Sequence, residues 1–381
     1  MTVQSKSSVE GFAVESKQIQ KAGDGSQQLQ AENVYIINGI SEQRVREICS
    51  EVAVAAISNN SQEATGVAMQ RIERFVDLLL PRIQRIEKDF ESFADPAFQV
   101  LLQKAQLTAI CTERDCDYSI LSELLVHRIN NKSNTKKKAS IAKAVEIIDQ
   151  VDDDSLCAIT MYHAIRTFIP LTGNIKEGIA TLSRLYEKIN PDLLPTNDMW
   201  MDNLSILGAI TIIPFSATQK YDDLIQKMLD GYACVGIKKE SEEYSKAIDI
   251  LNSKNMPHDI LVDHELLDGH VRLEINEKSA IERLAFGTPI IINGQEQMQN
   301  RPLTNEEKKC LYEIWDLYSK DEQLKKTVLQ KMMELLNSFE AMDKSIRWWN
   351  ALSANFRTTS IGRVIAHTNA KRIDNNLPDL D

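Results

Sequence analysis

Apolar side chains recur at helical spacing through most of this sequence, and this periodicity constrains the fold more than any other feature. Between residues 68 and 90 the apolar positions are separated by steps of three or four, which is the spacing of one face of an α-helix. The run predicts a stripe of about six turns, roughly 33 Å long, with a kink at Pro81. Core packing is the expected role, and a coiled-coil seam with a partner subunit stays open. The stripe consists of Ala68, Ile72, Phe75, Leu79, Ile83, Ile86 and Phe90.

Local capping signals place several helix starts. Ser41 is a natural N-cap, and Asp95 followed by Pro96 combines a capping side chain with proline at the first helical position. Thr304 and Glu307 have the spacing of a capping box. The chain holds 10 Pro and 14 Gly in 381 residues. Average usage would give roughly 19 and 27, so this scarcity favours long helices.

Residues 17–40 depart from the helical pattern. The Gln-Ile-Gln of residues 18–20 recurs as Gln-Leu-Gln at residues 28–30, with a Gly-Asp-Gly-Ser turn between the copies and a β-branched run after them. We expect short strands, arranged as a hairpin or a miniature solenoid. Because so small a β segment cannot bury a core alone, it either packs on its own body or stacks with other subunits, and we favour stacking. The predicted oligomerisation residues are Gln18, Ile19, Gln20, Gln28, Leu29, Gln30, Val34, Tyr35 and Ile36.

These patterns predict a mainly α-helical fold, namely a multi-helix bundle or array with a short N-terminal β segment and a small β-containing insert near the C-terminal third. Two strand-like runs bounded by glycines, HVRLEIN and TPIIING, indicate the insert. Short connections between the helices imply antiparallel neighbours. The predicted parts are a flexible leader (1–16), the β segment (17–40), a helical domain (41–255), the β-containing segment (256–302) and a C-terminal helical region (303–381).

Charge and cysteine usage exclude some classes of protein. With 44 basic and 55 acidic side chains the formal charge is −11, which excludes a generally basic nucleic-acid binder. The six cysteines lie in apolar stretches without CxxC spacing, so they are expected to be buried, reduced thiols. The first residues lack the pattern of a signal peptide. We therefore expect a cytoplasmic protein, and nothing in the sequence points to a cofactor.

Three histidines recur every six residues among acidic side chains between residues 258 and 270. Six residues separate side chains by roughly 20 Å along a strand and turn them to different faces of a helix, so a metal site is not expected. No catalytic residue is assigned. A nuclease-like enzyme with a non-contiguous site remains an alternative. Its candidate groups are Asp259, Asp263 and Glu265, with one of His258, His264 and His270.

Two further segments suggest alternative roles. Residues 203–219 form the longest uncharged stretch, for which a buried helix or strand is expected and a membrane-perturbing effector is the second alternative. The C-terminal end is locally positive beside two tryptophans. A solvated surface is expected there, with a nucleic-acid or lipid face as the alternative. The cations are Arg347, Arg357, Arg363, Lys371 and Arg372.

Three stretches of the sequence resemble a poorly characterised bacterial family of cytosolic proteins. They are QIQKAGDGSQQLQAENVYIINGIS, FADPAFQVLLQKAQLTAICTERDCDYSILSELLVHRI and TTSIGRVIAHTNAKR. The segment from Asp95 to Leu125 and the Thr-Ser-Ile-Gly motif are also distantly similar to the abortive-infection alpha group of phage-defence proteins. The resemblance implies a helical body with a small β-rich portion and a role in defence against phage. It carries no catalytic residue onto this chain.

A β segment too short to stand alone, joined to a helical body, predicts a non-enzymatic interaction protein. We expect it to oligomerise through residues 17–40 and to act as a sensor or scaffold, in antiphage defence as the resemblance implies. Its expected partners are further copies of this chain and another protein. Nucleic acid is not expected as a partner, and membrane contact depends on residues 203–219.

Overall fold

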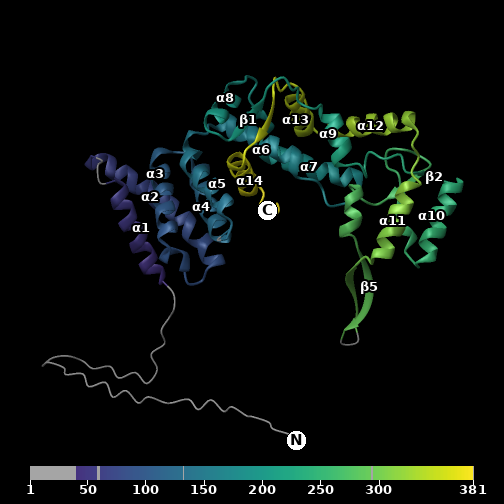
Figure 1. The fold of residues 1–381 in the computed structure, drawn as a ribbon, viewed down its shortest axis with the longest axis horizontal. Coiled ribbons are helices and arrows are strands. Elements are labelled where there is room, and N and C mark those ends of the chain that lie inside the picture. The colour runs from purple at the N-terminus through teal and green to yellow at the C-terminus, as the bar shows by residue number, and fades with distance from the viewer. Residues whose placement is uncertain (1–39, 58–60, 132, 293–294, 381) are drawn as a thin grey trace, which may run out of the picture. The chain divides into compact units, whose positions relative to one another are not determined.

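Helices make up most of the described structure. The computed structural model describes residues 40–57, 61–131, 133–292 and 295–380. Its few strands form small antiparallel sheets, so the predicted mainly α-helical fold class is confirmed (Figure 1). The predicted leader (1–16) and β segment (17–40) lie outside the described residues, apart from Ile40.

Helices α1 to α5 form the N-terminal part of the described structure. Their apolar faces pack on one another, chiefly α2 on α3 and α4, and α3 on α1 and α5. The C-terminal helix α14 joins this group, since it packs on α4, α5 and α6 (Figure 1). The bounds are α1 (Glu42–Ile57), α2 (Gln62–Ile86), α3 (Pro96–Cys111), α4 (Asp115–Asn130), α5 (Thr135–Ile147) and α14 (Ser360–Ile373).

Helix α6 lies at the centre of the main hydrophobic core. Every residue from 155 to 165 is buried, and the helix packs on α7, α8 and α14. A helix that is buried all round loses the amphipathic stripe of a surface helix. Helices α9, α12 and α13 extend the same core. The bounds are α6 (Asp153–Thr167), α7 (Ile175–Ile189), α8 (Met199–Ile206), α9 (Tyr221–Met228), α12 (Glu322–Asn337) and α13 (Glu340–Asn350).

Two short strands join segments that are far apart in the sequence. Strand β1 (Ile210–Ile213) pairs antiparallel with β7 (Asn355–Thr358), and we call the pair the β1–β7 ribbon. Phe356 is buried, whereas Arg357 is exposed. The ribbon therefore turns one face to the core and the other outward.

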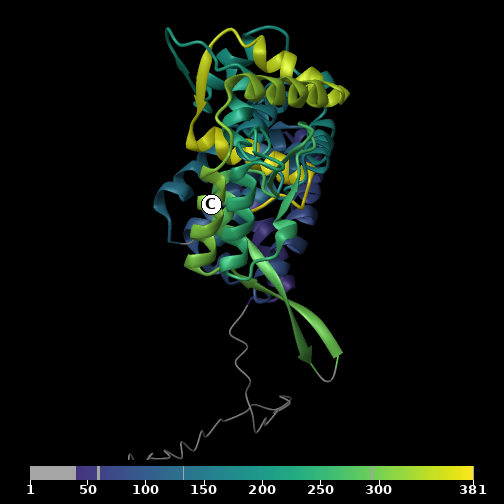
Figure 2. The same cartoon turned by 90° about the vertical axis from the view of Figure 1, so that its right-hand side faces the viewer.

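A second, smaller core contains residues between Ile237 and Tyr318. It lies between α10, α11 and a three-stranded antiparallel sheet of order β2-β4-β3. Beyond these helices the β5–β6 hairpin extends outward (Figures 1 and 2). The boundaries of the predicted domains stay predictions. The element bounds are β2 (Ile237–Lys238), α10 (Glu242–Ser253), β3 (Leu261–Asp263), β4 (His270–Leu273), β5 (Ala285–Ile292), β6 (Gln295–Pro302) and α11 (Asn305–Asp316).

The predicted caps are present. The Asp95 carboxylate accepts a hydrogen bond from the backbone N–H of Ala97 at 3.0 Å, at the start of α3. Thr304 and Glu307 form a reciprocal capping box at the start of α11. These helices begin where short-range capping satisfies N–H groups that have no partner within the helix.

The apolar stripe of α2 is confirmed except at its end. Ala68, Phe75 and Leu79 are buried, and Pro81 lies inside the helix. Ile86, however, is the last residue of α2 and is 42% exposed. Phe90 lies beyond the helix, where its backbone takes a left-handed φ of 48°. Phe90 is nevertheless buried, so tertiary packing rather than helical continuation brings it into the core.

Candidate functional site

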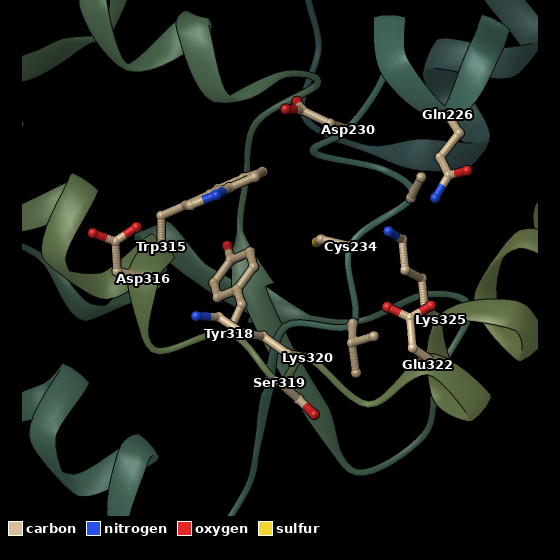
Figure 3. A pocket seen from close by; sticks show the side chains of 12 residues that line it. Gln226, Asp230, Cys234, Trp315, Asp316, Tyr318, Ser319, Lys320, Glu322 and Lys325 are labelled. Carbon is tan, nitrogen blue, oxygen red and sulfur yellow. The ribbon is translucent and has the colours of Figure 1, made fainter. Parts of the chain in front are cut away.

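A cavity of about 310 Å³ opens between helices α9, α11 and α12 (Figure 3). The rings of Trp315 and Tyr318, with centroids 4.7 Å apart, come from the end of α11 and the turn after it. Cys234, on the loop after α9, points toward these rings (Figure 3). Glu322 and Lys325, from the first turns of α12, line the other side. The lining thus combines an aromatic wall with a larger number of polar and charged side chains.

Burial shifts three groups of this cavity, Cys234, Tyr318 and Asp230, toward their neutral forms. Burial raises the pKa of the Cys234 thiol to about 12 and that of the Tyr318 phenol well above its usual range. The Tyr318 hydroxyl oxygen accepts a hydrogen bond from the backbone N–H of Leu273 at 2.7 Å. Burial also raises the pKa of Asp230. A protonated thiol and phenol are poor nucleophiles at neutral pH, so these groups suit binding better than covalent catalysis.

A second cavity, of about 480 Å³, lies between α6, the β1–β7 ribbon and the start of α14. The Tyr162 hydroxyl donates a hydrogen bond to the carbonyl oxygen of Phe356 at 2.7 Å, and the Tyr162 ring stacks on Trp349. These contacts tie α6 to β7 and α13, so core packing sets the walls. We call it the arginine cavity, after its three basic side chains. They are Arg166, Arg357 and Arg363.

The predicted oligomerisation residues, between 18 and 36, lie outside the described residues. Their role stays a prediction, as does the hairpin or solenoid expected for this segment. The cavities described above lie in the remainder of the chain, where neither was predicted from the sequence.

The acidic residues near position 260 have separate partners. Glu265 accepts hydrogen bonds from the backbone N–H groups of Ile175 and Lys176, at 2.7 and 3.1 Å, at the start of α7. Asp263 pairs with Lys239 at 2.6 Å. Within the described ranges, no group of three or more His, Cys, Asp or Glu side chains is placed to hold a metal ion. Glu265 therefore acts as a helix cap in this fold.

The histidines of the same segment are also separately engaged. A ring nitrogen of His264 lies 2.8 Å from the carbonyl oxygen of Cys234, and burial lowers the pKa of this histidine to about 4. A ring nitrogen of His258 lies 2.8 Å from the side-chain oxygen of Asn252, on α10. The regular spacing in the sequence thus brings these two side chains to different surroundings.

Residues 203–219 contain the end of α8, strand β1 and the loop that leads to α9. The prediction of a buried helix or strand holds for Ala209 and Ile210, which are buried. It is wrong for Ile206 and Phe215, because Ile206 is 84% exposed and Phe215 is fully exposed. Over the part of the chain that the structure describes, no helix is both long and apolar enough to cross a membrane.

One other expectation needs correction. Cys111 is exposed at the end of α3, although Cys49, Cys157 and Cys310 are buried as expected. The solvated surface expected at the C-terminal end holds for Arg347, Arg357, Arg363 and Arg372, which are exposed. Arg357 and Arg363 also line a cavity. No local signal in the sequence could have grouped Arg166 with Arg357 and Arg363, because only the packing of α6 on α14 brings it to their cavity.

The fold is that of a mainly α-helical protein with small antiparallel sheets. A family model described as ":-like" matches residues 39–380, which is most of the chain. The chain belongs to this family, and the expected membership of an uncharacterised family is confirmed. The description names neither an activity nor a ligand. No curated protein and no solved structure matches the chain.

Proposed function

We propose that this protein is a non-enzymatic, oligomeric sensor or scaffold whose body binds other protein chains. The observation that carries the proposal is a set of exposed apolar side chains on α8 and on the loop after β1. Large apolar side chains that a fold leaves exposed are candidates for contact with another protein chain. The neutral thiol and phenol of the cavity in Figure 3 agree with binding rather than covalent catalysis.

Helix α8 turns large apolar side chains outward. Met199 is 75% exposed and Ile206 is 84% exposed. These residues are seven positions apart, which is about two helical turns, so they lie on the same side of α8. The other face of α8 supports the core through Trp200 and Leu204, which are buried. The helix therefore has a buried apolar face, and its exposed side carries Met199 and Ile206 with the charged Asp202 between them. These two apolar side chains are available to a partner.

Phe215 strengthens this proposal. Its side chain is fully exposed, and its backbone φ is 58°, in the left-handed region. A bulky residue in that region carries roughly 1–3 kcal/mol of backbone strain, which a folded protein keeps chiefly at functional positions. The loop thus holds an aromatic ring in solvent at an energetic cost, as a recognition residue would require. We name Met199, Ile206 and Phe215 the α8 surface.

A second copy of this chain is the partner that we propose for the α8 surface. The sequence predicts self-association through residues 17–40, and an oligomer brings equivalent surfaces of several copies together. The antiphage role rests on the sequence resemblance alone. Plaque counts on cells that express the wild type or a surface variant test it, because a scaffold that cannot assemble should lose protection.

Sedimentation velocity tests the assembly proposal. We expect deletion of residues 1–39 to leave a folded but smaller assembly, since Ile40, whose N–H donates to the carbonyl oxygen of Asp89, is kept. The double variant Ile206→Ser/Phe215→Ser should also lower the number of subunits in the assembly. Val100→Ser is the matched control, because Val100 is 55% exposed on another helix. An unchanged number of subunits in the deletion variant contradicts self-association through residues 17–40. An unchanged number of subunits in the double variant contradicts the α8 surface.

A further inference from the structure

We propose that the arginine cavity binds the phosphate groups of a small polyphosphate-bearing ligand through Arg166, Arg357 and Arg363. This inference is independent of the α8 surface and of residues 17–40. It starts from three guanidinium groups that tertiary packing brings to one cavity.

Three different elements supply the three arginines. Arg166 lies in the last turn of α6, where its guanidinium carbon is 5.7 Å from the centroid of the Tyr162 ring. Arg357 lies on the exposed face of β7, and Arg363 lies near the start of α14. The Asn369 side chain of α14 donates a hydrogen bond to Thr160 of α6 at 2.9 Å. Because buried contacts of this kind join the elements, the scaffold of the cavity is formed before any ligand arrives.

The described residues leave the three charges without an acidic partner. Among the described residues, no ion pair involves these arginines and no acidic side chain lines their cavity. By contrast, Arg347, nearby in the sequence, pairs with Asp343 at 2.5 Å. In a chain of net charge −11, acidic partners are abundant. Three like charges around one cavity repel one another, so an anionic ligand would relieve an unfavourable interaction.

The position of Arg363 also favours an anionic ligand. It lies in the first turns of α14, after the N-cap Thr359. A cation near a helix N-terminus is unfavourable, because that end of the helix carries partial positive charge. The same N-terminus favours an anion, and so does the guanidinium. A bound phosphate would therefore interact favourably with both.

Polyphosphate fits the chemistry and the size of the cavity. Guanidinium groups donate paired hydrogen bonds to phosphate oxygens, and three of them match the several negative charges of a di- or triphosphate better than the single charge of one carboxylate. The cavity volume of about 480 Å³ lies within the usual range for small-molecule sites. Gln219, Asn355 and Thr358 add neutral polar groups to the lining.

Isothermal titration of the full-length protein at low salt tests the proposal. The probes are inorganic pyrophosphate, inorganic tripolyphosphate and ATP, each without divalent cations. Single variants Arg166→Gln, Arg357→Gln and Arg363→Gln remove one charge each from exposed positions, so the fold should be kept, and circular dichroism checks this. Arg184→Gln, on an exposed position of α7 outside the cavity, is the control with the same change of charge.

We expect saturable binding of at least one probe. Each cavity variant should weaken it by about tenfold or more, because charge-assisted hydrogen bonds are lost, whereas Arg184→Gln should leave it unchanged. Tighter binding of ATP than of tripolyphosphate identifies a nucleotide as the ligand, and equal affinities of the two identify the polyphosphate group alone. Failure of every probe to bind overturns the proposal, and so does binding that the cavity variants weaken no more than Arg184→Gln does.

Discussion

Gly362 lies directly against the carbonyl oxygen of Ala209. A Cβ atom at position 362 would be 2.0 Å from that oxygen, far inside van der Waals contact. The same oxygen accepts hydrogen bonds from the backbone N–H of Thr359 at 2.9 Å and from its hydroxyl at 3.0 Å. Hydrogen bonds thus hold the start of α14 against Ala209, the residue before β1. Only glycine at position 362 lets the two backbone segments come this close.

Replacing Gly362 with Ala should destabilise the protein by about 2 kcal/mol, because backbone must move to admit the methyl group. Urea unfolding measures the change. Gly66→Ala is the matched control, since Gly66 also lies within a helix and its new Cβ would meet nothing within 4 Å. The control should gain up to about 1 kcal/mol from helix propensity. Equal effects of the two substitutions would contradict the close packing of α14 on Ala209.

Replacing Glu265 with Gln should cost about 2 kcal/mol of stability, since Glu265 caps α7 and lies 3.4 Å from the fully buried guanidinium of Arg272. Asp263→Asn removes a neighbouring carboxylate that is 79% exposed, and should cost less than about 1 kcal/mol. Thermal unfolding of both variants makes the comparison. Similar losses in the two variants would show that Glu265 has no special structural role.

Acid should destabilise the protein through a buried chain of histidines. The Thr167 hydroxyl, His163, His367 and the carbonyl oxygen of Pro378 are linked by successive contacts of 3.3, 3.2 and 2.9 Å, which neutral rings complete as hydrogen bonds. Burial lowers the pKa of His163 to about 4. Between pH 6.5 and 4 the unfolded chain therefore binds a proton that the folded protein does not, so stability falls as pH falls.

Urea unfolding at pH 7, 6 and 5 measures this effect. The slope for one histidine is at most about 1.4 kcal/mol per pH unit. The stability difference between the wild type and His163→Gln should shrink as pH falls, because the variant lacks the titrating ring. A difference that stays constant with pH would refute the contribution of His163.

Cys111 should react first with a thiol reagent in the folded protein. It is the exposed cysteine, whereas burial raises the pKa of Cys49 and Cys157 to about 12 and also shields them. A short maleimide pulse at pH 7.5, followed by peptide mass analysis, identifies the labelled positions. The urea-unfolded protein, in which all six thiols should react, is the control. Rapid native labelling of Cys49 or Cys157 would contradict their burial.

Helix starts and the long apolar stripe were predictable because both depend on residues a few positions apart. The Asp95 cap and the Thr304–Glu307 box each act within one turn of their helix. Predictions from local patterns were wrong where contacts between distant segments determine whether a side chain is buried. Phe90 is buried although α2 ends before it, and Ile206 is exposed although its uncharged neighbourhood predicted burial.

The arginine cavity could not be predicted from any local pattern. In the sequence, helices α7 to α13 lie between Arg166 and Arg363, and the pairing of β1 with β7 follows only from the complete core. The sequence by itself determined the helical fold class and the ends of several helices, because periodicity and capping act over one or two turns. Only the tertiary structure decided which charges share a cavity and which apolar side chains stay in solvent, because those contacts depend on how distant segments pack together.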